Sequence, residues 1–163
     1  MSRAFVKEDG PDNEPLPDLP ISPHPNFVTP RGLAALETRL GSVRRDLARL
    51  KARDDRLDLL PEKAAERDIR YLEARLASAI PVDPAGQPRD EVAFGARVTV
   101  ANREGDETIY EIVGEDEADA SLNRITPQSP LARALLGAAV GDIVDWRRPA
   151  GSVELEITAI DYA

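Results

Sequence analysis

The apolar residues between positions 33 and 79 fall into two series whose spacings alternate between three and four, as in the seam of a coiled coil. The first series is Leu33, Leu36, Leu40, Val43, Leu47 and Leu50, and the second is Ala65, Ile69, Leu72, Leu76 and Ala79. The two series pair in opposite directions, from Leu33 with Ala79 to Leu47 with Ala65, as facing positions in an antiparallel hairpin do. The pattern therefore predicts a helical hairpin over residues 29–80 that folds back near Arg56.

Proline positions mark the start of each helix. Thr29 is expected to cap the first helix, and Pro30 suits the first helical position, where a missing N–H costs nothing. Pro61 is expected in the first turn of the returning helix.

The fold-back is acidic. Extending the seam places Asp54 opposite Asp58, with Asp55 between them, where the apolar pairing ends. Two interpretations remain open: a carboxylate cluster meant to meet a partner, or one capping aspartate among ordinary solvated turn residues.

The period changes after a proline-rich linker at residues 81–90. Strands are predicted over residues 92–101, 108–113, 123–126, 142–147 and 152–161. A short helix over residues 129–135 is expected to begin with Ser129 as its cap and Pro130 in its first turn. Residues 91–163 are therefore predicted to form a small antiparallel sheet packed on one short helix, which makes the whole chain α+β.

Half of the chain's 14 prolines lie in the first 30 residues, where apolar periodicity is almost absent. Residues 1–28 are expected to be an extended, acidic, largely disordered leader that packs on neither domain and is dispensable for folding. Phe27 and Val28 are the first candidate anchors to the folded body, and His24, between prolines, is expected to be a plain surface residue.

Composition removes several classes of function. The chain has no cysteine and one histidine, which excludes disulfides and thiolate catalysis and argues against a histidine-based metal site. Four carboxylates in residues 115–119 lack the glycine-interrupted spacing of a calcium loop, so no metal is expected there. The net charge of −9, with basic residues concentrated in the hairpin, argues against autonomous binding to duplex nucleic acid. Without an apolar run of membrane length or a signal peptide, the protein is expected to be soluble and cytoplasmic, with no cofactor.

Several motifs together resemble the bacterial Gre transcript-cleavage factors over roughly residues 27–163. They occupy residues 28–32, 94–100, 110–119, 129–137, 140–142, 154–157 and 160–162. The resemblance implies an FKBP-like C-terminal domain that docks at the rim of the RNA polymerase secondary channel, with Ser129, Pro130 and Leu131 at the contact. The implied protein is a monomer that meets nucleic acid only through the polymerase complex.

The resemblance also implies that the hairpin enters the channel. There its tip carboxylates, here Asp54, Asp55 and Asp58, would help hold the second catalytic Mg²⁺ of the polymerase and promote hydrolysis of backtracked RNA. The factor alone is then not an enzyme and binds no metal in isolation. The tip motif typical of the cleavage factors, Asp-Leu-x-Glu-Asn-Ala-Glu-Tyr, is absent, and each arm is shorter by roughly eight residues, or about 12 Å at a helical rise of about 1.5 Å.

Three functions remain open at this point. The first is a Gre-like factor that modulates elongation. The second is a short-hairpin paralogue, similar to regulators of nucleoside diphosphate kinase, that occupies the channel without stimulating RNA cleavage. The third is an interaction module or a peptidyl-prolyl isomerase, but Tyr110, Trp146 and Tyr162 are too few and too scattered to predict an apolar proline pocket.

Overall fold

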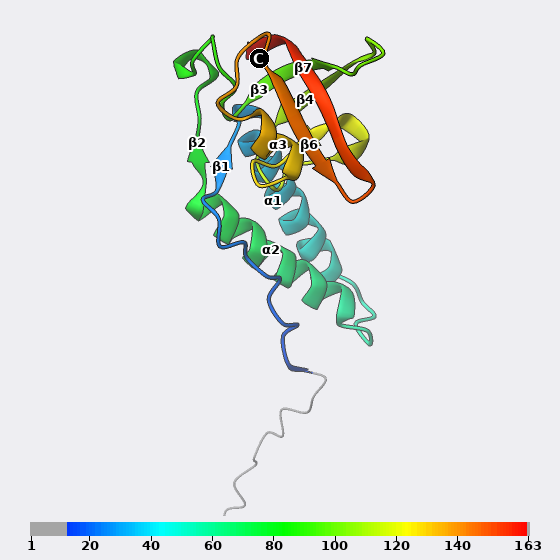
Figure 1. Ribbon diagram of the computed structural model, residues 1–163. Coiled ribbons are helices and arrows are strands. Elements are labelled where there is room, and N and C mark those ends of the chain that lie inside the picture. Colours follow the sequence, from blue (N-terminus) through cyan, green and yellow to red (C-terminus); the bar gives the residue numbers. More distant parts are fainter. Residues whose placement is uncertain (1–12, 163) are drawn as a thin grey trace, which may run out of the picture.

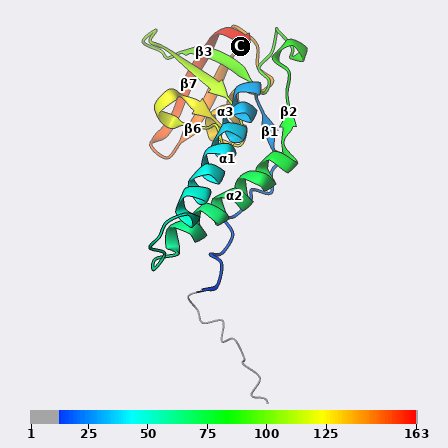
Figure 2. The ribbon, with the colours of Figure 1, turned by 180° about the vertical axis from the view of Figure 1, so that it is seen from behind.

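A computed structural model describes residues 13–162 of the chain (Figure 1). The helices and strands in chain order are β1 (Phe27–Val28), α1 (Pro30–Lys51), α2 (Leu60–Ser78), β2 (Ile80–Pro81), β3 (Ala96–Ala101), β4 (Glu107–Ile112), β5 (Arg124–Ile125), α3 (Pro130–Leu135), β6 (Ile143–Arg148) and β7 (Gly151–Tyr162). Helices α1 and α2 lie side by side and project away from the sheet, with their connecting loop at the far end (Figures 1 and 2). The predicted α+β class and helical hairpin are thereby confirmed. No helix within residues 13–162 combines the length and apolarity needed to cross a bilayer.

The hairpin is held together by the predicted seam. Leu36, Leu40 and Leu72 are buried in one cluster with Val28. The partly buried side chains packed against this cluster are Leu33, Val43, Ile69, Tyr71, Leu76 and Ala79. The connecting residues 52–59 include Arg56, the predicted point of fold-back.

The predicted start signals of the first and third helices are confirmed. The Thr29 hydroxyl accepts a hydrogen bond from the Gly32 N–H at 2.9 Å, and α1 begins at Pro30. In the same way, the Ser129 hydroxyl accepts from the Ala132 N–H at 3.3 Å, and α3 begins at Pro130. Both helices therefore use a hydroxyl cap followed by proline in the first turn.

The sheet has the strand order β5-β4-β3-β7-β6 and is mixed. All its pairings are antiparallel except that of β5, which runs parallel to β4 with Glu111 opposite Arg124. The expectation of a wholly antiparallel sheet is therefore wrong at this edge. The chain between β4 and β5 makes the acidic loop and a 3-10 turn at Ala120–Leu122, which returns β5 in the direction of β4.

One face of the sheet packs on α3 and forms the larger core. Its buried members are Val92, Ala96, Val98, Val100, Ile112, Leu131, Ala132, Leu135, Val144, Leu155, Ile157 and Tyr162. Strand β3 begins at Ala96, four residues later than predicted, because Gly95 has a φ of +87° and turns the chain immediately before the ladder starts.

The N-terminal segment corrects an expectation. Strand β1 pairs in parallel with β2, and Val28 is only 3% exposed. Asn26 is also buried, and Gly114 approaches the segment so closely that an added Cβ would lie 2.5 Å from the Phe27 carbonyl oxygen. Val28 therefore anchors the segment as predicted, whereas the expectation that the segment packs on neither domain is wrong for Asn26, Phe27 and Val28. Deleting residues 1–28 is expected to lower the melting temperature. The disorder expected for residues 1–12 falls outside the described residues.

Candidate functional site

The tip of the hairpin carries the three predicted aspartates, all of them exposed. The Asp55 carboxylate accepts a hydrogen bond from the Leu57 N–H at 3.1 Å, and the Asp58 carboxylate accepts from the Leu60 N–H at 2.9 Å. Asp58 therefore supports the entry to α2, as one interpretation of the cluster expected, but its exposed carboxylate still faces solvent. The side chain of Leu57 stands out between them at 94% exposure.

The two tip arginines are engaged by groups other than these carboxylates. Arg56 donates from Nε and Nη2 to the Glu62 carboxylate at 2.8 and 2.6 Å, and these hydrogen bonds hold the pKa of Glu62 below its usual range. Arg53 donates to the backbone carbonyls of Leu50 at 3.0 Å and Asp58 at 3.2 Å. Glu62 is only 5% exposed, so this bidentate pair holds Arg56 of the connecting loop against the first turn of α2. The arginines thus shape the turn and leave the aspartates available.

The tip is not a preassembled metal centre. Within residues 13–162, no three or more His, Asp or Glu side chains are arranged to hold a metal ion. Carboxylate oxygens suit Mg²⁺, but an ion at this tip would need additional oxygen ligands from another molecule.

The second predicted site lies at the start of α3. Pro130 is exposed, whereas Leu131 is 3% exposed and belongs to the sheet core. Ser129 is partly buried and donates its hydroxyl hydrogen to the Thr126 carbonyl at 2.8 Å. Of the three residues, only Pro130 presents a large surface to a partner, while Ser129 and Leu131 fix its position.

The acidic loop, residues 114–119, joins the two halves of the molecule, a role that the sequence did not reveal. The Glu117 carboxylate accepts from the Thr29 hydroxyl and from Arg31 Nε, both at 2.6 Å. Arg31 also pairs with Glu111 on β4 at 2.5 Å. The cap of α1 is thereby tied directly to the sheet domain.

A buried arginine completes this joint. Arg75 of α2 is 2% exposed and donates to Asp116 at 2.7 Å and to the Asn26 side-chain oxygen at 2.8 Å. Glu115 lies 3.4 Å from its guanidinium, and the Asn26 amide returns a hydrogen bond to the Arg75 carbonyl at 2.8 Å. We call Asn26, Arg75, Glu115, Asp116 and Glu117 the joint. The sequence offered one signal for this joint. Arg75 lies three residues after Leu72, on the seam side of α2, and the acidic loop had no basic partner assigned to it.

Tyr71 at the joint gives a pH-dependent prediction. Burial, together with the hydrogen bond from its hydroxyl to Asp116, raises the pKa of Tyr71 to about 12. The unfolded chain loses this proton near pH 10, so the folded state is expected to lose stability as pH rises from about 10 to about 12. Urea unfolding at several pH values should show that loss, and Tyr71→Phe should reduce it. If Tyr71→Phe lost as much stability over this pH range as the unaltered protein, the assignment of the loss to Tyr71 would be wrong.

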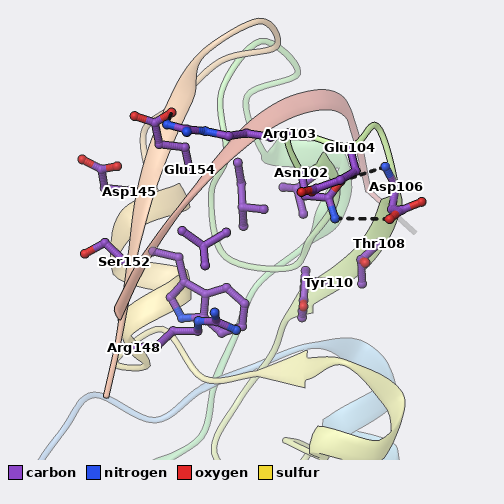
Figure 3. Close-up of a pocket in the computed structure, with 14 residues that line it drawn as sticks. Asn102, Arg103, Glu104, Asp106, Thr108, Tyr110, Asp145, Arg148, Ser152 and Glu154 are labelled. Carbon is purple, nitrogen blue, oxygen red and sulfur yellow. Dashed lines mark hydrogen bonds and ion pairs between the residues drawn. The ribbon is translucent and has the colours of Figure 1, made fainter. Parts of the chain in front are cut away.

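A groove of about 620 Å³ lies on the sheet near the β3–β4 turn (Figure 3). Tyr110 and Trp146, which looked scattered in the sequence, meet there edge to face with ring centroids 6.2 Å apart. The guanidinium of Arg148 covers the Trp146 ring at 5.0 Å, and the rim carries the Arg103–Glu154 ion pair at 2.7 Å. This charged rim differs from the apolar lining that an isomerase needs for a proline.

Comparison with known proteins identifies the family. Residues 87–162 match the family described as "Transcription elongation factor, GreA/GreB, C-term". A GreA from Psychrobacter sp. strain PRwf-1 is 38% identical over 152 residues, covering 83% of this chain and 96% of the relative. The chain therefore belongs to the GreA/GreB family of transcription elongation factors.

Other relatives match over a smaller part. GreA from Pseudomonas aeruginosa is 46% identical over 99 residues, 60% of this chain and 63% of the length of that relative. Among solved structures, GreA/GreB from Nitrosomonas europaea has 24% identity and a TM-score of 0.43, covering 84% of this chain and 99% of its own. Gfh1 from Thermus thermophilus has 23% identity and a TM-score of 0.40, covering 85% of this chain and 99% of its own.

Proposed function

We propose that this protein binds RNA polymerase at the secondary channel and modulates elongating or backtracked complexes, with the hairpin tip entering the channel. The observation that carries the proposal is a two-helix arm with three exposed aspartates at its far end, in a chain of the GreA/GreB family. It acts as a monomer without a cofactor and meets nucleic acid only through the polymerase complex. The protein is then not itself an enzyme.

The chemistry of the tip supports this role. Hard Mg²⁺ takes oxygen ligands and uses few protein carboxylates, so an incomplete site in another protein can accept one or two of them. Asp54, Asp55 and Asp58 are exposed, while Arg56 is held by Glu62. In a two-metal site, the two ions together would stabilise the attacking and the leaving oxygens. An arm that reaches the catalytic centre of the polymerase would thus offer ligands to it, and the isolated protein would hold no ion.

Site-directed radical footprinting tests where the tip lies. The chain has no cysteine, so Leu57→Cys, at a position that is 94% exposed, allows one iron–EDTA group to be attached at the tip. With core polymerase, we expect cuts in polymerase segments that line the active centre. The matched control is Ala150→Cys, in the exposed turn between β6 and β7. Cuts from the tip that fall only on the outer polymerase surface would overturn the proposal.

Docking through the start of α3 gives a second prediction. Pro130→Glu is expected to weaken polymerase binding by about tenfold or more, because it places a charge in an apolar contact. Glutamate is tolerated in the first turn of a helix, so Ser129 should still cap α3 and the melting temperature should change little.

Polymerase affinity and thermal melting should be measured on the same preparations, with Pro130→Ala as the uncharged control. Unchanged affinity in Pro130→Glu would remove Pro130 from the contact. A large fall in melting temperature would assign the residue to folding instead.

A further inference from the structure

Residues 14–25, which we call the strap, run along α2 from its C-terminal end towards the tip (Figures 1 and 2). Near the joint, the Ser22 hydroxyl donates to Glu115 at 2.9 Å. Farther along, Arg70 of α2 donates from Nε to the Asp18 carboxylate at 2.6 Å and from Nη2 to the Leu16 carbonyl at 2.8 Å. The strap is therefore a third chain segment on the arm.

The strength of attachment falls from the joint to the tip. Directly after the strap, Asn26 is buried against Arg75, and leaving such groups unpaired is strongly unfavourable. The Asp18 side chain is 75% exposed and that of Arg70 is 38% exposed. An exposed ion pair of this kind shifts an equilibrium by no more than about fivefold. The hydrogen bond from Arg70 to the Leu16 carbonyl and the half-buried Leu16 and Leu19 side chains add to this pair, but no contact of residues 14–20 is as buried as that of Asn26 with Arg75. We therefore expect the tip-proximal end to leave α2 first while the other end stays anchored.

The released end would uncover part of the tip. Glu14, Pro15 and Leu16 form one wall of a groove of about 490 Å³. The other lining residues are Leu57, Asp58, Leu59, Leu60 and Lys63. In this closed arrangement, the strap widens the end of the arm and places Glu14 in the same groove as Asp58.

We propose that the strap is an autoinhibitory contact whose tip-proximal part, residues 14–20, must separate from α2 before the arm can enter a narrow partner channel. The proposal rests on the proposed function, because it assumes that the arm enters such a channel. A two-helix rod is about 20 Å across, since each helix is about 10 Å wide, and the closed strap adds to this width. The apparent affinity of the arm is then the intrinsic affinity multiplied by the fraction of molecules with an open strap.

Opening can be measured in the free protein. Pro15→Cys and Leu60→Cys place two spin labels on opposite walls of the groove in a chain without other cysteines. We expect mostly short label distances, and a shift of the distribution to longer distances in Arg70→Ala. Arg44→Ala is the matched control, because it removes the exposed Arg44–Glu73 pair at 2.8 Å on the same hairpin. An unchanged distribution in Arg70→Ala would overturn the releasable contact.

Gating is measured with core RNA polymerase. Arg70→Ala should bind about two- to fivefold more tightly than the unaltered protein, and Arg44→Ala should bind as the unaltered protein does. The short label distance should disappear in the complex. A retained short distance, or weaker binding by Arg70→Ala, would overturn the gating role. If neither the unaltered protein nor any variant bound polymerase, the proposed function and the gating role would both be wrong. The label distances in the free protein would still show whether the strap can separate from α2.

Discussion

Replacement of Arg75 by methionine is expected to lower the free energy of unfolding by about 3–5 kcal/mol, the cost typical of breaking a buried ion pair. Burial opposes the charge of Arg75, but the hydrogen bond and charge of Asp116 outweigh it and keep its pKa raised. Methionine fills a similar volume but removes the guanidinium that donates to Asp116 and Asn26, so that Asp116 keeps only the hydrogen bond from Tyr71. Urea unfolding monitored by far-UV circular dichroism measures the loss.

Two comparisons make this prediction specific. Arg44→Met breaks an exposed pair with Glu73 and should cost no more than about 1 kcal/mol. Adding Asp116→Leu to Arg75→Met should restore part of the lost stability, because the double variant no longer leaves Asp116 charged without its guanidinium partner. A loss below about 1 kcal/mol in Arg75→Met, or no recovery in the double variant, would show that the joint contributes little.

The joint also bears on function, because it fixes the direction of the arm relative to the sheet domain. Arg75 and Asn26 bind α2 to the N-terminal segment, and Glu117 binds the cap of α1 to the loop after β4. A partner that grips the sheet domain and receives the arm needs these two parts at a defined angle. If the chain binds polymerase through both parts, as we propose, weakening the joint should reduce its polymerase affinity. The contact made by the sheet domain should be affected less than the contact made by the arm.

Local patterns in the sequence predicted the helices and their starting points, because these features depend on residues that are close together in the chain. The alternating spacing of Leu36 and Leu40 forecast a buried helical seam, and Thr29 with Pro30 forecast where α1 begins. The same reasoning placed the acidic turn at Asp54 to Asp58, between the two helices. Each of these signals lies within a few residues of the structure that it specifies.

The features that escaped prediction depend on partners far away in the chain. Glu117 meets Thr29 across a separation of 88 residues, and Asn26 meets Arg75 across 49. Arg75 lies on the seam side of α2, but a charged side chain at such a position is more often solvated than buried, and Asn26 gives no periodic signal at all. The proline-rich segment lacked apolar periodicity because hydrogen bonds and one short strand pairing, instead of a long apolar face, hold it to the hairpin.

Our prediction for RNA cleavage depends on the length of the arm. Helix α1 has 22 residues and therefore extends about 33 Å at a rise of about 1.5 Å per residue. The alignment with the Psychrobacter GreA is 152 positions long yet covers only 83% of this 163-residue chain. The alignment therefore contains positions at which only the relative has a residue, which is what a shortened hairpin in this chain would produce.

We therefore expect this protein to occupy the channel but to stimulate cleavage of backtracked RNA at least about 100-fold less than a GreA with a full-length hairpin. A ligand must lie about 2 Å from Mg²⁺, and misplacement of a reacting group by even about 1 Å can cost a factor of about 100. Asp54→Ala/Asp55→Ala/Asp58→Ala should abolish the remaining stimulation without changing polymerase affinity. The measurement is cleavage by stalled, backtracked complexes, with Asp46→Ala on the α1 shaft as the control carboxylate. Cleavage as fast as that of the long-hairpin factor, lost in the triple variant, would contradict the short-arm prediction and establish full ligand delivery by the tip.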